Sequence, residues 1–170
     1  MKIAGMILVI LGTTRAGYYM RERLKARIRC LGQAIWLFRF MESEIGYQKS
    51  ELAVVFSRAA DRMEGGFSKI LHRVAKRLQL RNGEDFKKIW QEEWTGAEKE
   101  NGMLGEELSV IREFATQGYQ DVHMQLMQIQ MIRKQLEQIK SRLEAELQQK
   151  GRIYLCVGML SGMVVSIILI

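Results

Sequence analysis

Proline is absent from all 170 residues, and cysteine and histidine occur only twice each. Because proline breaks helix interiors and is common in turns and at strand edges, its absence is typical of an all-helical chain. Cys30 and Cys156 have no C-x-x-C partner, so neither a disulfide framework nor a zinc site is indicated. His72 and His123 are too far apart to indicate a metal site, and we interpret both as helix-surface residues. The sequence therefore predicts no metal and no cofactor.

Catalytic motifs are lacking as well. The chain has no phosphate-binding loop, no G-x-S-x-G and no His-Cys or His-Ser constellation with supporting spacing. Glu42 and Glu44 are two residues apart, so on a helix their side chains point roughly 200° from each other and cannot form a catalytic pair on one face. We expect a protein that is not an enzyme.

The positive charge is confined to one region. The net charge is +7, and most of the excess comes from a basic cluster just after the N-terminal apolar run: Arg21, Arg23, Lys25, Arg27 and Arg29. Lys2 and Arg15 supply two more positive charges, and residues 31–170 are almost balanced and show no basic groove with interleaved aromatic residues. The sequence therefore predicts no nucleic-acid partner.

Both ends of the chain are apolar. Residues 153–170 carry no charge, and as a helix they would extend about 27 Å, close to the thickness of a bilayer core. Residues 1–20 form a second apolar run interrupted by Lys2 and Arg15, with Tyr18 and Tyr19 at its end. A cleaved signal peptide is the alternative for this run, but Arg15 and Tyr18 stand where a cleavage site needs small residues. We predict two membrane spans, 1–20 and 153–170.

Basic residues set the expected orientation. They follow the first span and also precede the second, so the positive-inside rule places residues 21–152 in the cytoplasm and both termini outside. The prediction is a two-pass protein of the cell membrane that contacts lipid through its spans. Glycines at a spacing that permits close helix packing could join the two spans; they are Gly5, Gly12, Gly158 and Gly162.

The region between the spans, 21–152, shows helical periodicity throughout and strand alternation nowhere. Apolar residues recur every three or four positions from Leu24 to Ile45, and again from Val122 to Leu147. Four shorter stripes lie between these two long helices, within residues 52–63, 67–78, 86–94 and 104–114, and glycines separate several of them. We predict an all-α bundle of about six helices, two long and four short, flanked by the membrane helices.

Several stretches resemble one protein family. The opening MKIAGMILVILGTTRAGYYM, the segment MESEIGY from Met41 to Tyr47, the tryptophan helix KIWQEEW, the segment FATQGYQDVHMQ from Phe114 and the final GMLSG occur in the expected order. Together they are similar to the stage III sporulation protein AB family of endospore-forming bacteria. The chain departs from that family where Arg23-Leu24 and Ser50-Glu51 replace motifs that usually contain proline.

The resemblance implies a function in sporulation. It implies a helical domain similar to the F domain of type II secretion platform proteins, and a cytoplasmic secretion-type ATPase as partner. It also implies a place in the membrane channel between mother cell and forespore, with the helical domain on the mother-cell side. A membrane-anchored helical scaffold or signalling hairpin unrelated to secretion is the alternative. The sequence leaves open whether the chain forms a homo-oligomer.

Four residues are candidates for partner binding. Glu42, Glu44 and Tyr47 belong to the family-like segment near the end of the first long helix. A glutamate near a helix C-terminus is mildly unfavourable, which favours a partner contact, although solvated glutamates and a tyrosine plugging the turn are the alternative. Asp121 precedes the last helix, and we prefer an N-cap role for it over a partner contact.

Overall fold

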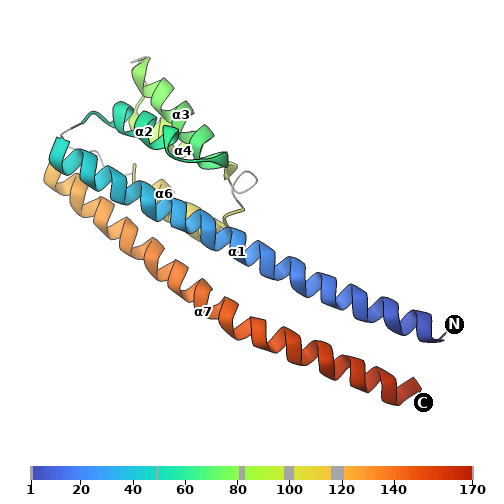
Figure 1. The fold of residues 1–170 in the computed structure, drawn as a ribbon. Coiled ribbons are helices and arrows are strands. Elements are labelled where there is room, and N and C mark those ends of the chain that lie inside the picture. The colour runs from blue at the N-terminus through green and yellow to red at the C-terminus, as the bar shows by residue number, and fades with distance from the viewer. Residues whose placement is uncertain (1, 49, 81–82, 98–101, 116–120, 170) are drawn as a thin grey trace. The chain divides into compact units, whose positions relative to one another are not determined.

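The computed structural model describes the backbone of residues 2–48, 50–80, 83–97, 102–115 and 121–169, and the side chains of 15, 18–47, 50–80, 83–97, 102–115 and 121–149. Within these ranges the chain is all-helical, as predicted, and contains no strand. The described helices are two long and four short ones (Figure 1): α1 Lys2–Gln48, α2 Leu52–Asp61, α3 Gly65–Gln79, α4 Phe86–Glu93, α6 Gly105–Glu113 and α7 Val122–Leu169.

The chain divides into two compact units. One unit comprises Met1–Ile28 and Ser141–Ile170, and the other is the continuous segment Arg29–Lys140. In the first unit, the backbone is helical over both predicted spans, from Lys2 in α1 and as far as Leu169 in α7. In the described part of the chain, no helix is sufficiently long and apolar to traverse a bilayer. Most side chains of 1–20 and all those of 153–170 lie outside the described residues, so the two spans stay predictions.

The basic residues of the cluster that belong to the first unit lie on α1 and are partly paired. Lys25 Nζ and Glu22 Oε1 form an ion pair of 2.8 Å within one helical turn. The Arg23 guanidinium lies 5.9 Å from the centre of the Tyr19 ring. Tyr18 and Tyr19 are both largely exposed.

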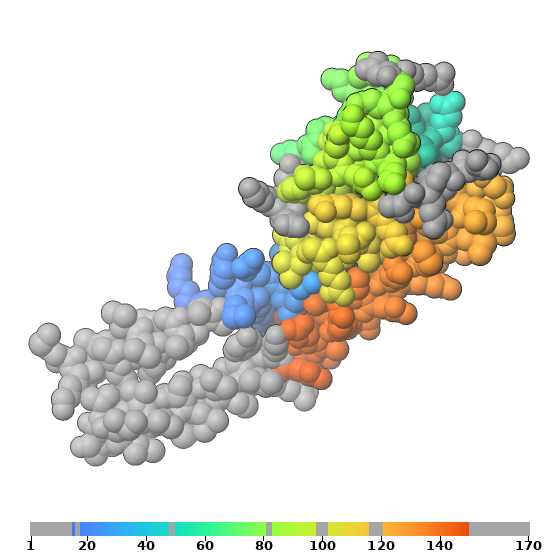
Figure 2. All heavy atoms as spheres, turned by 180° about the vertical axis from the view of Figure 1, so that it is seen from behind, coloured from blue at the N-terminus to red at the C-terminus, as the bar shows by residue number. Residues whose placement is uncertain are grey.

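The predicted apolar stripes form the core of the unit Arg29–Lys140. Leu31, Phe38 and Met41 of α1 are fully buried, and so are Ile132 and Leu136 of α7. Figure 2 shows α3 in green above α6 in yellow, with the first half of α7 in orange beside α6. At two helices the predicted apolar stripe begins too early, because its first residue, Leu104 or Val122, is about half exposed.

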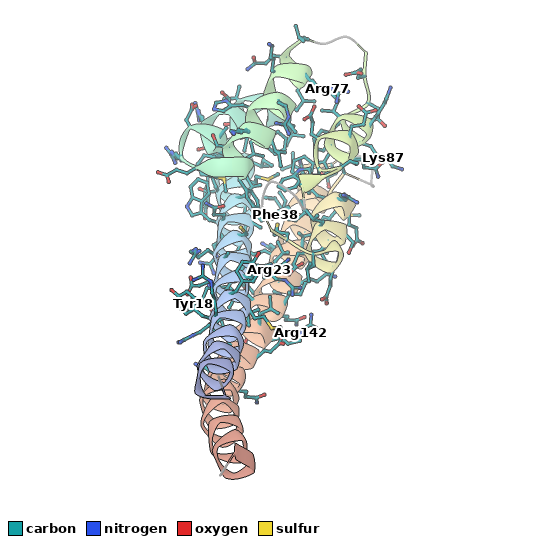
Figure 3. All side chains as sticks on the ribbon, turned by 90° about the vertical axis from the view of Figure 1, so that its right-hand side faces the viewer. Tyr18, Arg23, Phe38, Arg77, Lys87 and Arg142 are labelled. Carbon is teal, nitrogen blue, oxygen red and sulfur yellow. The ribbon has the colours of Figure 1, made fainter. Side chains whose placement is uncertain are left out.

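Aromatic side chains fill the centre of this unit. Trp90 of α4 contacts the Phe56 ring of α2 and the Phe114 ring after α6, with both pairs of ring centres 5.3 Å apart. The indole N–H of Trp90 donates to the carbonyl oxygen of Ile111 at 2.8 Å, which satisfies the one polar atom of this buried side chain. Phe38 of α1, labelled in Figure 3, meets Phe114 edge to face. One aromatic cluster therefore joins four segments of the chain.

Two glycines with positive φ explain where the short helices begin. Gly65 and Gly83 both have φ of +72°, in the left-handed region that other residues rarely adopt. Gly65 opens α3 directly after α2, and Gly83 precedes α4, whose first turn is capped by the Asp85 side chain accepting from the Lys87 N–H. These turns lie where the sequence predicted helix boundaries.

Candidate partner-binding site

Glu42 and Tyr47, near the end of α1, point in different directions. The Glu42 carboxylate faces α7, where it accepts a hydrogen bond of 2.7 Å from Gln130 Nε2 and lies 3.5 Å from Arg133 Nε. Tyr47 contributes to neither contact, and its side chain is 89% exposed. Of the three predicted partner-binding residues at the end of α1, Tyr47 is therefore the one presented most openly to solvent.

The Glu44 side chain points towards α2, away from both Glu42 and Tyr47, and is buried. Its carboxylate accepts from Arg58 Nη1 of α2 at 2.8 Å and from Ser50 Oγ at 3.3 Å, and its side chain is only 8% exposed. A buried carboxylate is tolerated when charged and polar donors satisfy it. Glu44 therefore holds α2 against α1, and the different directions of Glu42 and Glu44 agree with the sequence argument that they cannot act as a pair.

Asp121 caps α7. Its Oδ1 accepts from the N–H of His123 at 3.3 Å, and its carbonyl oxygen accepts the N–H of Gln125 at 3.2 Å. The first of these bonds satisfies an N–H at the helix start, which is the function of an N-cap. The structure thus gives Asp121 the capping role that we preferred for it.

The end of α1 packs on the beginning of α7. A methyl group placed on Gly46 would lie 3.7 Å from Leu126 Cδ2, in ordinary van der Waals contact. Together with the bond between Glu42 and Gln130, this contact shows that the two helices run antiparallel here. Glu42, Tyr47 and Asp121 are therefore brought to the same end of the bundle, although they are far apart in the sequence.

A second polar link between α1 and α7 lies further along the pair. Glu137 accepts from Arg39 Nη2 at 2.7 Å and from Arg133 Nη1 at 3.1 Å. The hydrogen bond from Arg39, followed by that from Arg133, lowers the pKa of Glu137 below its ordinary value. Arg133 lies one turn before Glu137 within α7, whereas Arg39 reaches it from α1.

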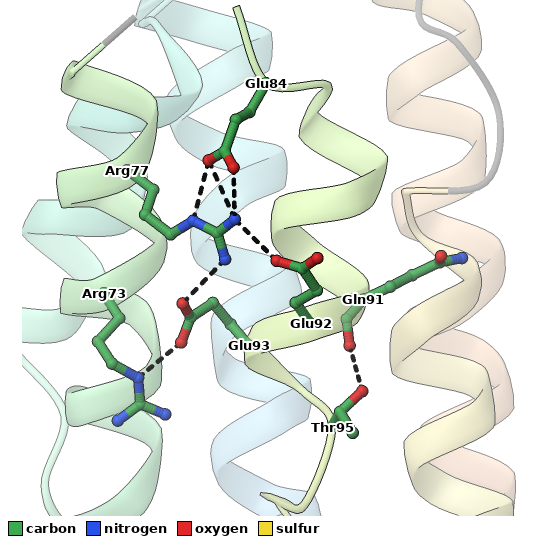
Figure 4. A network of polar contacts seen from close by, with 7 residues as sticks. All are labelled: Arg73, Arg77, Glu84, Gln91, Glu92, Glu93 and Thr95. Carbon is green, nitrogen blue, oxygen red and sulfur yellow. Dashed lines mark hydrogen bonds and ion pairs between the residues drawn. The ribbon is translucent and has the colours of Figure 1, made fainter. Parts of the chain in front are cut away.

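An ion network joins α3 to α4 (Figure 4). Arg77 donates to Glu92, Glu84 and Glu93, and Arg73 donates to Glu93 at 2.6 Å. Hydrogen bonds to Glu92 and then Glu84 raise the pKa of Arg77 above its ordinary value. The network occupies both oxygens of Glu93 and fixes the position of α4 beside α3.

Sequence reasoning missed one aromatic pair, in which Trp36 is exposed and Phe40 is half-buried. Trp36 and Phe40 lie on the face of α1 opposite the predicted apolar stripe, and Arg62 of the α2 C-terminus reaches over the Phe40 ring. The sequence could have indicated this pair, because two aromatic residues four positions apart fall among polar residues on the outer face of that helix.

The histidines, the cysteine and the glycines singled out in the sequence form no site within the described residues. His72 and His123 are exposed on helices, as interpreted from the sequence. Burial raises the pKa of the Cys30 thiol. Gly5, Gly12, Gly158 and Gly162 lie where the environment of the helices is outside the described residues, so their packing role stays a prediction. Within the described ranges, no cluster of three or more His, Cys, Asp or Glu residues could hold a metal ion.

Over the described residues the geometry defines a class of protein: an all-helical bundle with two long helices, in which Glu42 and Glu44 accept hydrogen bonds from neighbouring helices. The family model of stage III sporulation protein AB matches residues 2–170. The chain belongs to that family, and the family membership associates it with sporulation.

A solved structure supports the same fold. The chain is similar to a structure titled stage III sporulation protein AB, with a TM-score of 0.66 and 19% sequence identity, and the alignment covers 72% of this chain and 97% of that chain. No curated protein matches the sequence.

Proposed function

We propose that the protein is a non-catalytic membrane platform component of a secretion-like channel between mother cell and forespore. In this proposal residues 1–20 and 153–170 span the cell membrane, both termini are extracytoplasmic, and residues 21–152 receive a secretion-type ATPase on the mother-cell side. Membership of the sporulation family and the basic residues flanking 21–152 support it.

The continuity of α7 carries the mechanical part of the proposal. This helix runs from Val122 to Leu169 as one element, and it includes both the buried Leu136 and the apolar run as far as Leu169. The glycine at position 151 does not interrupt it. Neither proline nor another break in the helical backbone divides α7 between Val122 and Leu169. A displacement caused by ATPase binding would therefore reach the membrane partners of the channel.

Tyr47 is the residue that we expect to contact the ATPase. Its side chain is 89% exposed, while Glu42 is held by Gln130 and Glu44 by Arg58. Exposed tyrosines are effective in interfaces because they combine a large apolar ring with a hydroxyl group. The two glutamates would act mainly by fixing the end of α1 on which Tyr47 stands.

Co-purification tests the proposal. The full-length protein is extracted from sporulating cells in detergent, and the secretion-type ATPase encoded by the same genome is detected by mass spectrometry. We expect the ATPase to be retained, and Tyr47→Ala to reduce retention about tenfold or more, as for a central interface residue. The control is Leu80→Ala, which shortens another exposed apolar side chain.

The scaffold alternative gives a different result. A membrane-anchored hairpin unrelated to secretion would purify without the ATPase, while still recovering other membrane proteins. Absence of the ATPase from a preparation that contains the folded protein and its membrane partners would contradict the proposal.

A further inference from the structure

An aromatic stack lies on the outer face of α1, away from the core. The rings of Trp36 and Phe40 are 5.2 Å apart between centres and inclined by only 7°. Trp36 is 37% exposed, whereas its neighbours Leu37 and Phe38 are fully buried. A tryptophan in this position does not contribute to the described core, and an exposed aromatic cluster of this kind is a common mark of an interaction site.

Arg62 adds an unused positive charge to the stack. Its guanidinium carbon lies 5.0 Å from the centre of the Phe40 ring, so the cation contacts a π face. Among the described contacts, Arg62 has no carboxylate partner. The aromatic contact orients the guanidinium without using its N–H groups, which can still donate to an acceptor from outside.

Two further arginines extend this positive surface along α1. Arg39 lies on the side of α1 that faces α7, and its side chain is 62% exposed although one of its N–H groups is bonded to Glu137. Arg29 is exposed two turns before Trp36 and therefore falls on the same helix face. We name these five residues (Arg29, Trp36, Arg39, Phe40 and Arg62) the Trp36 surface.

We propose that the Trp36 surface binds a segment of another protein that carries apolar side chains flanked by carboxylates. The Trp36 indole would cover an apolar side chain, and Arg62 and Arg39 would bind carboxylates on the two sides of it. Tryptophan and arginine are the residues that most often dominate binding energy, because they combine large contact areas with directed hydrogen bonds. The inference is independent of whether that segment belongs to the proposed ATPase.

Charge distinguishes this occupant from a second copy of the chain. Symmetric self-association would place the arginines of one Trp36 surface opposite those of the other, and like charges in contact are unfavourable. An anionic lipid surface fits less well, because the Trp36 ring is covered on one face by Phe40 and the carboxylates of Glu42 and Glu137 lie on the neighbouring side of α1. A segment with separate carboxylates can reach Arg62 and Arg39 while avoiding those glutamates.

Site-specific photo-crosslinking in sporulating cells tests the inference. Ser43 is exposed and lies seven residues after Trp36 on the same face, so a benzoylphenylalanine at this position in the full-length protein reports the occupant. The crosslinked peptide is identified by mass spectrometry. We expect a segment of a different protein that contains apolar residues flanked by Asp or Glu, and we expect no such adduct from the same probe at Lys87 of α4.

Substitutions within the Trp36 surface test the inference quantitatively, through the amount of crosslinked adduct. Arg62→Glu and Trp36→Ala should each reduce the adduct about tenfold or more, as expected for dominant interface residues. The matched control is Lys69→Glu, which makes the same charge change at an exposed position of α3. Thermal melting and circular dichroism show whether each variant is folded, and Arg62→Lys, which retains the charge, should keep most of the adduct.

Other outcomes overturn the inference. These are an adduct with lipid, an adduct with a second copy of this chain, an adduct with a basic segment, no adduct at Ser43, or equal losses from Arg62→Glu and Lys69→Glu. The ATPase co-purification has its own readout at Tyr47, so failure of one proposal leaves the other measurable.

Discussion

Arg58 Nη1 donates to Glu44 Oε2 at 2.8 Å, and this bond joins α2 to the end of α1. The Glu44 side chain is almost fully buried, while that of Arg58 is about half exposed. The carboxylate thus depends on a donor that solvent also reaches. The contact makes Glu44 a structural residue next to the exposed Tyr47, and it leads to the first prediction.

Glu44→Gln should destabilise the protein moderately. The variant keeps the shape of the side chain but replaces a charge-assisted hydrogen bond with a neutral one, and the exposure of Arg58 reduces the effect to about 1 kcal/mol. For a chain of this size the melting temperature should fall by about 2–4 °C. Thermal melting of the full chain in detergent measures it. Glu64→Gln, at an exposed position with no side-chain cap, should change the melting temperature little.

The stability should depend on the ionisation of Glu137. Hydrogen bonds from Arg39 and then Arg133 lower the pKa of this carboxyl in the folded protein. The stabilisation is therefore present above the ordinary carboxyl pKa and is lost as the pH falls through the lower, folded-state value. Melting temperatures measured from pH 7 down to about pH 3 should fall less steeply for Glu137→Gln than for the unmodified protein. Equal slopes for the two proteins would contradict the assignment.

Trp90 of α4 and Trp94, which follows the end of this helix, should respond differently to the same substitution. The Trp90 indole donates to the Ile111 carbonyl, whereas the buried Trp94 indole N–H has no acceptor among the described residues. Both side chains are fully buried, so replacement by phenylalanine removes similar apolar area. Trp90→Phe should cost about 1 kcal/mol more than Trp94→Phe, because it removes one of the hydrogen bonds to the Ile111 carbonyl, which keeps the Phe114 N–H as a donor. Urea unfolding of the two variants gives the comparison, and a larger loss for Trp94→Phe would refute it.

An interruption of α7 should separate folding from function. Insertion of Gly-Gly after Gln149 introduces two flexible residues into α7 just before the apolar run 153–170, without changing the core. We expect the bundle to remain folded and the ATPase to co-purify, while sporulation is lost. The same insertion after Glu64, in the turn between α2 and α3, is the control and should preserve sporulation. Normal sporulation with the first insertion would show that the protein is a passive tether.

Labelling of single cysteines tests the topology. In a Cys30→Ser, Cys156→Ser background, Lys2→Cys should react with an impermeant maleimide added to intact cells, and Lys88→Cys on α4 should react only after permeabilisation. The reason is that basic residues flank the region 21–152 on both sides. Labelling of Lys88→Cys from outside intact cells would contradict the cytoplasmic location of the bundle.

Much of the candidate site was predictable as a set of positions but not as a set of contacts. The segment from Met41 to Tyr47 was identified from its likeness to the family, and the argument that Glu42 and Glu44 face different ways is confirmed. The partners of these glutamates, Gln130 and Arg58, carried no signal in the sequence. The opposite holds for Trp36 and Phe40, whose spacing was visible but whose contact with Arg62 depends on how α2 returns along α1.

The sequence by itself determined the helices and their buried faces. Periodicity near 3.6 is a local property, so residues such as Phe38 and Leu136 could be assigned to a core before any partner was known, and Gly65 and Gly83 marked turns through their own backbone preference. Only the tertiary structure decided which polar groups meet. Arg39 and Glu137 are 98 residues apart, and their ion pair exists because α1 and α7 pack antiparallel in one register. That register is set by the filling of the shared core, which depends on all the helices at once and is not encoded in any single segment.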